Sequence, residues 1–208
     1  MPEAETPESK TPDCKTRMSR GRQRPVAGRD QILDAARAIG ARHGWRAVTI
    51  RAVARELGYS SPLLYEHFRH KEDLLTRIAV EALSLLEVKV TENLPTNRRA
   101  TILTMIERYW TFMLEHTHLY RLMNGMDGVS IDREAIKWSA RSLCKTMGDA
   151  VRPLAGETVT AAEAQILADE LWALLHGMAT LFMDRFAAFD LERVTKAALR
   201  LISGAQTP

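Results

Sequence analysis

Residues 30–75 read DQILDAARAIGARHGWRAVTIRAVARELGYSSPLLYEHFRHKEDLL, and the pattern of this stretch decides the fold. Near its centre, apolar residues at positions 50, 53, 54 and 57 have the spacing of one helix face. Gly58 follows, where a left-handed residue without a Cβ can end that helix at no steric cost. Ser60 or Ser61 can cap a second helix, and Pro62 suits its first turn. Two short helices joined so tightly cross steeply, which is the helix-turn-helix arrangement that puts one helix into a DNA major groove.

The same stretch resembles the N-terminal DNA-binding domain of the tetracycline-repressor (TetR) family of one-component regulators. No single piece of the match is specific, but all of them occur here in the family's order and spacing. The pieces are ILDAA at 32–36, GW at 44–45, TIRAVA at 49–54, LGYS at 57–60, LYEHF at 64–68 and KEDL at 71–74.

The resemblance implies roles for the third helix, expected over residues 61–68. Pro62 and Leu63 should lie near the DNA bases and Tyr65 against the backbone, while Leu64 and Phe68 pack inward. Apolar contact with thymine methyls should then carry base reading. The candidate DNA-binding residues are Arg51, Ser60, Ser61, Pro62, Leu63, Tyr65, His67 and Lys71, with Arg20, Arg22 and Arg24 of the preceding segment.

Two positions depart from the family pattern. Ser61-Pro62 replaces the usual basic-plus-small pair, which shifts the helix start and removes one backbone N–H. His70 stands where a Ser or another capping residue commonly begins the fourth helix.

The segment before the helix-turn-helix is divided by charge. Residues 15–29 carry six Lys or Arg and no acidic residue, whereas the acidic residues of the N-terminus all precede Cys14. A basic arm here could reach phosphates or a minor groove. The alternative is a solvated, disordered tail, which its prolines and lack of apolar residues favour. Met18 is a second possible translation start.

The rest of the chain is expected to be helical, so the fold class is all-α with about nine helices. We expect a tail over 1–28, a DNA-binding domain over 29–75 and an effector-binding and dimerisation domain over 76–208. Asp30 should cap the first helix, and Trp45 should pack back on the three-helix unit. Further helices are expected at 30–42, 71–93, about 102–116, 118–124 and 136–151, and Pro153 should close the last of these. Two more should run from a Thr160 capping box to about 186 and from 190 to 204.

Composition and motifs exclude several classes of protein. With 46% hydrophobic and 26% charged residues, the 208-residue chain is typical of a soluble globular protein. No apolar run is long enough to span a bilayer and no secretory signal is visible, so we expect no membrane partner and a cytoplasmic location. Cys14 and Cys144 indicate neither a disulfide framework nor a zinc site. The chain lacks catalytic and phosphate-loop motifs, and His116 and His118 lack a further ligand nearby, so we expect no enzyme, cofactor or metal.

The last two helices indicate a homodimer. One is apolar nearly all round, and pairing with a second copy would bury the excess in a four-helix interface. The resemblance implies the same arrangement, and a two-fold dimer would read a palindromic operator. The candidate dimerisation residues are Leu171, Leu175, Met178, Phe182, Val194, Ala198 and Leu201.

Large and pliable apolar residues in the second domain suggest an effector pocket, because Met adapts to varied guests. Trp172, His176 and Gly177 also resemble the Trp-His-Gly signature of one TetR subgroup. His176 could hydrogen-bond inside the bundle with Gly177 as a packing notch, or it could be the polar anchor of the effector. The candidate ligand-binding residues are Trp110, Met113, Met123, Met126, Trp138, Met147, Trp172 and His176.

The expected function is therefore that of a homodimeric transcription regulator, a repressor released from a palindromic operator by a small apolar effector. Effector binding would move the fourth helix as a lever and change the spacing of the two reading helices. The alternatives are a ligand-binding or protein-interaction module with altered DNA binding, an activator, and a regulator that depends on a co-repressor.

Overall fold

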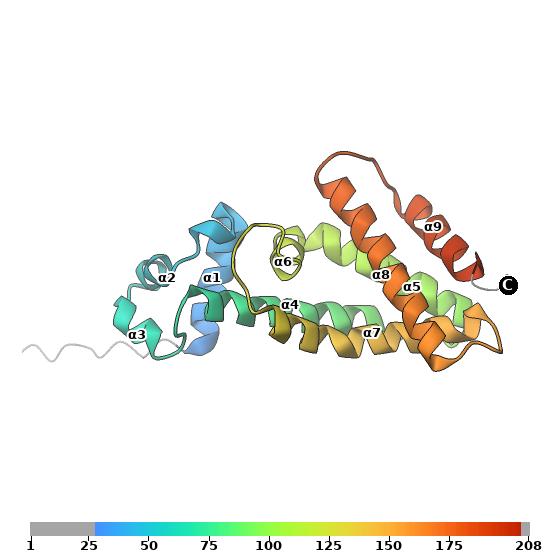
Figure 1. Cartoon of the computed structure of the whole chain (residues 1–208). Coiled ribbons are helices and arrows are strands. Elements are labelled where there is room, and N and C mark those ends of the chain that lie inside the picture. The colour runs from blue at the N-terminus through green and yellow to red at the C-terminus, as the bar shows by residue number, and fades with distance from the viewer. Residues whose placement is uncertain (1–27, 205–208) are drawn as a thin grey trace, which may run out of the picture.

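Apolar periodicity produces helices throughout the described part of the chain. The computed structural model describes residues 28–204, which contain nine α-helices, one 3-10 helix and no strand (Figure 1). This confirms the all-α fold class. The elements are α1 (Arg29–His43), η1 (Trp45–Ala47), α2 (Ile50–Leu57), α3 (Ser61–Tyr65), α4 (Lys71–Thr91), α5 (Arg98–Glu115), α6 (Thr117–Met123), α7 (Arg133–Ala155), α8 (Ala161–Met183) and α9 (Leu191–Gly204).

Elements α1 to α3 form a small unit, here called the head. The Thr49 hydroxyl accepts the Ala52 N–H at 3.0 Å and caps α2, and Gly58 ends α2 in the left-handed conformation with φ +70°. The Gly58 end is as the sequence predicted, whereas the Thr49 cap was not among the predictions. Leu64 and Phe68 are fully buried, so their predicted inward packing is confirmed.

The ends of α1 and α3 differ from the predictions. Gly28, not Asp30, precedes α1, because the Gln31 side chain accepts the Gly28 N–H at 3.2 Å and fixes the start of the helix there. Helix α3 ends at Tyr65 instead of continuing to residue 68, because the next two N–H groups bond to carbonyls three residues back and tighten the last turn.

His70 supplies the cap at the start of α4 that its residue type did not suggest. Its ring Nδ1 accepts the Asp73 N–H at 3.2 Å, while the Asp73 carboxylate accepts the Arg69 N–H at 3.1 Å. These reciprocal bonds satisfy donors that a helix start leaves open. Helix α4 ends at Thr91, two residues before the predicted end, and is about 31 Å long at 1.5 Å per residue.

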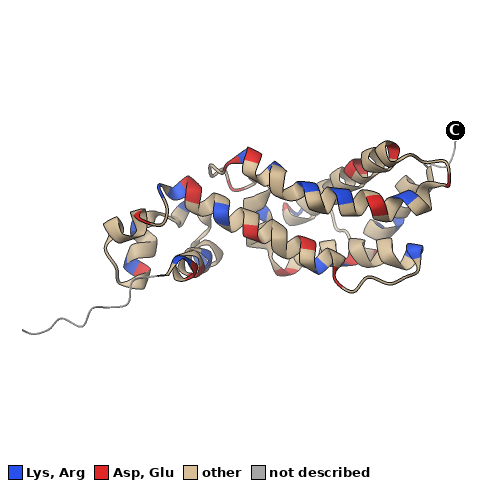
Figure 2. Ribbon diagram, turned by 90° about the horizontal axis from the view of Figure 1, so that it is seen from below, with Lys and Arg blue, Asp and Glu red and all other residues tan. Residues whose placement is uncertain are grey.

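Helices α4 to α9 form the body. Figure 1 shows α4 running out of the head into the body beside α7, with α8 crossing in front of α5 and α9 next to α8, away from the head. Figure 2 shows basic and acidic residues interspersed along the long helices. Pro153 lies inside α7, which continues to Ala155, so the prediction that Pro153 closes this helix is wrong. Pro153 has no N–H, so the last turn of α7 lacks the bond to the carbonyl four residues back.

Helix α8 is the body's most apolar helix. It begins with the predicted capping box, in which the Thr160 N–H donates to the Glu163 carboxylate at 2.8 Å, and it ends at Met183, earlier than predicted. By length and composition alone it could cross a membrane, but core helices pass the same test, and one face of α8 packs into the body.

Candidate functional site

The exposed end of the head is built around α3. Tyr65 is 52% exposed, and Pro62 and Ser60 also face solvent. Leu63 is half-buried against the head core, and Arg51 is exposed at the start of α2. The structure thus brings these predicted residues together on α3, the preceding turn and the first turn of α2.

His67 and Lys71 are both partly buried. His67 is half-buried, and its Nε2 has no hydrogen-bond partner within residues 28–204. The Lys71 ammonium donates to the Arg46 carbonyl at 2.9 Å, and partial burial lowers its pKa. A phosphate contact from Lys71 would have to share or replace that bond. Arg20, Arg22 and Arg24 lie outside the described residues.

Trp45 joins the head to the body. Its side chain is 1% exposed and covers Gly40, where an added Cβ would lie 2.5 Å from the indole ring. Its predicted packing on the head is therefore confirmed. The indole Nε1–H also donates to the His118 carbonyl of α6 at 2.7 Å, a contact that sequence reasoning missed. Residues 45 and 118 are far apart in the chain, so no local pattern signals their contact.

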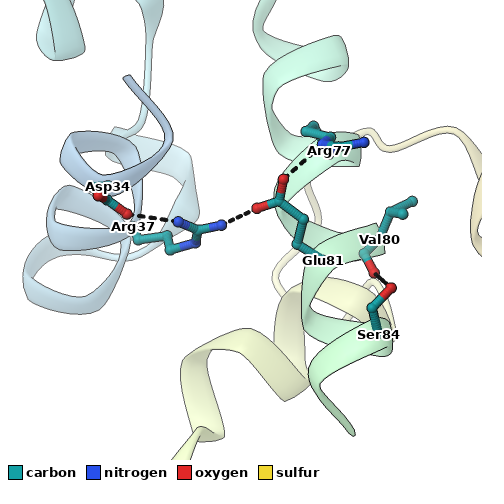
Figure 3. A network of polar contacts seen from close by, with 6 residues as sticks. All are labelled: Asp34, Arg37, Arg77, Val80, Glu81 and Ser84. Carbon is teal, nitrogen blue, oxygen red and sulfur yellow. Dashed lines mark hydrogen bonds and ion pairs between the residues drawn. The ribbon is translucent and has the colours of Figure 1, made fainter. Parts of the chain in front are cut away.

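Two further contacts cross between head and body, and a third lies beside one of them. The Arg46 side chain donates to the Asp127 carbonyl at 3.2 Å, in the loop between α6 and α7. The Glu81 carboxylate of α4 forms an ion pair with Arg37 of α1. It forms a second ion pair, at 2.7 Å, with Arg77 of its own helix (Figure 3). We call these contacts, with Trp45 and Lys71, the seam.

A chain of hydrogen bonds crosses the body from α5 to α8. The hydroxyls of Tyr109 and Tyr120 lie 2.8 Å apart, and the Tyr120 hydroxyl lies 2.7 Å from His176 Nδ1. Burial raises the pKa of Tyr120 to about 12 and lowers the pKa of His176, so the chain is uncharged near neutral pH. Of the two alternatives for His176, the hydrogen bond inside the bundle is present.

Gly177 does not form the expected packing notch within one protomer. It is exposed on α8, and an added Cβ would meet no atom within 4 Å. Its small size is therefore not required by any contact among the described residues.

The candidate ligand-binding residues do not share one cavity. Trp110, Met123 and Met147 belong to the core, and Trp138 is 70% exposed beneath Arg141, whose guanidinium lies 4.8 Å from its ring. The set is divided between the core and two cavities. One, of about 460 Å³, is lined by Met113, Thr117, Arg121, Phe182, Met183, Arg185, Ala187 and Ala188; the other, of about 360 Å³, is lined by Leu83, Met123, Asn124, Arg133, Ile136, Lys137, Ala140, Cys144, Asp169, Trp172 and Ala173. Met126 is half-buried outside both cavities.

Most candidate dimerisation residues are already used inside one protomer. Leu171, Leu175, Met178, Val194 and Ala198 are buried in the body core of one protomer, and their contact with a second copy stays a prediction. Phe182 and Leu201 are partly buried. The outward stripe of α8 instead carries Ile166 (60% exposed), Glu170, Ala173, Gly177 and Leu181. The apolar pattern predicted two buried faces but could not tell which one faces the protomer's own core.

Two family models match the chain. "Bacterial regulatory proteins, tetR family" matches residues 32–78, and "Tetracyclin repressor-like, C-terminal domain" matches residues 102–202. The repressor AcnR of Corynebacterium efficiens is 34% identical over 70 residues, which are 34% of this chain and 37% of AcnR. The chain thus matches little more than a third of that relative's length. An uncharacterized HTH-type transcriptional regulator of Mycobacterium tuberculosis is 27% identical over 182 residues, which are 85% of this chain and 80% of that protein.

Solved structures agree on the fold. A Rhodococcus protein of unknown function has a TM-score of 0.72 at 23% identity, covering 88% of this chain and 98% of its own. BioQ, solved with its double-stranded DNA operator, has a TM-score of 0.66 at 20% identity, covering 86% and 98%. Head and body together therefore share the fold of these structures. The chain belongs to the TetR family.

Proposed function

We propose that this protein is a homodimeric repressor that binds a palindromic operator in the cytoplasm and is released by a small effector bound in the body. The observation that carries the proposal is the exposed end of α3, where Tyr65 and Pro62 face solvent while Leu64 and Phe68 hold the helix on the head. The match to the AcnR repressor and the fold shared with DNA-bound BioQ support this function. The Trp172, His176 and Gly177 pattern supports membership of the Trp-His-Gly subgroup.

A gel-shift assay with the DNA upstream of its own gene tests operator binding. Tyr65→Ala should abolish the shift, whereas Val88→Ala, an exposed change on the distal half of α4, should not. Wild-type binding should weaken about tenfold or more between ~50 and ~200 mM salt, because phosphate contacts release counterions. Absence of binding even at low salt would leave the ligand-binding or interaction module as the better description.

The outward stripe of α8 supports the dimer. Its small and apolar residues have few contacts within the protomer, and pairing with a second copy would cover them. Gly177→Arg has room to fold in one protomer but would place a charge in the interface. We expect monomers in sedimentation and loss of operator binding, whereas Ser142→Arg on exposed α7 should stay dimeric. A dimeric Gly177→Arg protein would place the interface elsewhere.

A further inference from the structure

We propose that the cavity between α6, α7 and α8 takes a small apolar molecule with an anionic end, such as a carboxylate, and that Arg133 meets that end. The proposal deepens the proposed function, since it names the chemical class of the effector and the residue that selects it.

The walls of this cavity are suited to an apolar ligand. Its volume of about 360 Å³ is at the lower end of the range for small-molecule sites. The Trp172 ring packs edge-on against Tyr109, with 5.6 Å between ring centroids, so one wall is held in place. The apolar lining comes from Leu83, Met123, Ile136, Ala140 and Trp172.

Arg133 supplies positive charge at one end of the cavity. Among residues 28–204 no carboxylate lies within ion-pair distance of its guanidinium, which lies instead against Gly125. Arg121, which lines the other apolar cavity, differs because Asp127 and Asp184 pair with it at 2.9 and 3.7 Å. An arginine whose charge has no partner favours an anion, because a carboxylate can bind its fork of N–H donors.

The charges on the cavity walls also determine the orientation of the bound ligand. Lys137 lies one helical turn after Arg133, paired only with exposed Glu134 at 2.7 Å, a pair that solvent weakens. Cys144 follows Arg133 by eleven residues, about 16 Å along α7, and Asp169 lies near it. Burial raises the pKa of the Cys144 thiol, so that end offers a neutral thiol and one carboxylate. An anionic group is therefore favoured only at the Arg133 end.

The position of Arg133 connects ligand binding with the head. Its guanidinium rests on the loop between α6 and α7, and the same loop bonds to Arg46 of the head through the Asp127 carbonyl. The neighbouring Asp132 N–H donates to Thr76 of α4 at 2.9 Å. An anion that draws the Arg133 guanidinium off Gly125 removes a contact that holds this loop in place. The position of the head then changes only to the extent that the ligand binds the changed loop conformation more tightly.

Thermal-shift titrations with octanoate, 1-octanol and octylamine separate the anionic end from the apolar chain. Octanoate should raise the Tm most and octylamine least. Arg133→Gln should weaken octanoate binding roughly 10- to 100-fold, the loss of one hydrogen-bonded charge, and leave octanol unchanged. Arg133→Lys should keep part of the preference and so controls for folding. Arg141→Gln, which loses an arginine stacked on Trp138 outside the cavity, should bind octanoate like the wild type.

Equal stabilisation by octanoate and octanol, no shift with octanoate, or unchanged octanoate binding by Arg133→Gln would overturn the proposal. The gel shift without ligand is the separate test of the regulator. Operator binding together with any of these three results means that the ligand class is wrong while the proposed function stands. Octanoate binding that depends on Arg133, without operator binding, means that the ligand class is right while the proposed function is wrong.

Discussion

The seam between head and body and the cavity beside Arg133 use similar residues in opposite ways. At the seam, the Trp45 indole N–H, the Arg46 side chain and the Lys71 ammonium all bond to backbone carbonyls of the same chain. At the cavity, Trp172 is partly exposed and Arg133 has no carboxylate partner in the described range. Substitutions at the seam should therefore damage folding, whereas substitutions at the cavity should alter binding and leave folding nearly intact.

The largest expected effect comes from removing the aromatic side chain at the seam. Trp45→Ala should lower the free energy of unfolding by about 3–5 kcal/mol, because it leaves a cavity above Gly40 and removes the hydrogen bond to the His118 carbonyl. Thermal denaturation should show a Tm lower by roughly 6–20 °C. Trp138→Ala is the matched control and should stay within about 0.5 kcal/mol, because that ring is exposed. Similar losses from both variants would contradict the contrast.

A smaller effect is expected at Gly125, in the loop that connects the two regions. Its φ of +70° is costly for a residue with a Cβ, and an added Cβ would also collide with the Arg133 guanidinium. Gly125→Ala should cost about 1–2 kcal/mol in urea unfolding. Gly204→Ala, where a Cβ meets nothing within 4 Å, should be close to neutral. A neutral Gly125→Ala would contradict the left-handed backbone at this position.

The ion pairs of Glu81 should contribute less, since all three side chains are partly exposed. Glu81→Gln should cost about 0.5–1 kcal/mol by chemical denaturation, because one carboxylate serves two arginines on two helices. Glu192→Gln removes an exposed pair with Lys196 within one helix and should have no measurable effect. Equal costs would mean that the link between α1 and α4 adds nothing beyond an ordinary surface pair.

The smallest effect is expected from pH. Burial lowers the pKa values of His176 and His118, so the folded protein binds protons less readily than the unfolded chain. Stability should be fully present above about pH 6.5, the ordinary pKa of histidine, and fall as the pH drops below it. Tm values measured from pH 7.5 to 5.5 should show this fall. The decline should be shallower in His176→Gln.

The head was predictable because its signals are local. Gly58 and the inward pair Leu64 and Phe68 act within a few residues of their own helices, and each lies where the sequence indicated. The start of α1 was missed because Gln31, an ordinary helix residue, fixes it through a side-chain bond.

The body was less predictable because its contacts join distant segments. Helix α8 is apolar on more than one face, and periodicity alone does not separate the face in the core from the face that carries Gly177. Trp138 was grouped with the pocket residues by type, yet it lies outside both apolar cavities. Arg133 gave no signal at all, since its significance depends on which carboxylates lie near it in space.

Because Trp45 is buried between head and body, its fluorescence can report on the contact between them. A buried indole bonded to a carbonyl emits at shorter wavelength than one in water, and acrylamide quenches it poorly. Trp138 is the main exposed contributor, so Trp138→Phe would leave emission dominated by enclosed indoles. In that background, separation of the head from α6 would appear as a red shift and as faster quenching, without any attached dye.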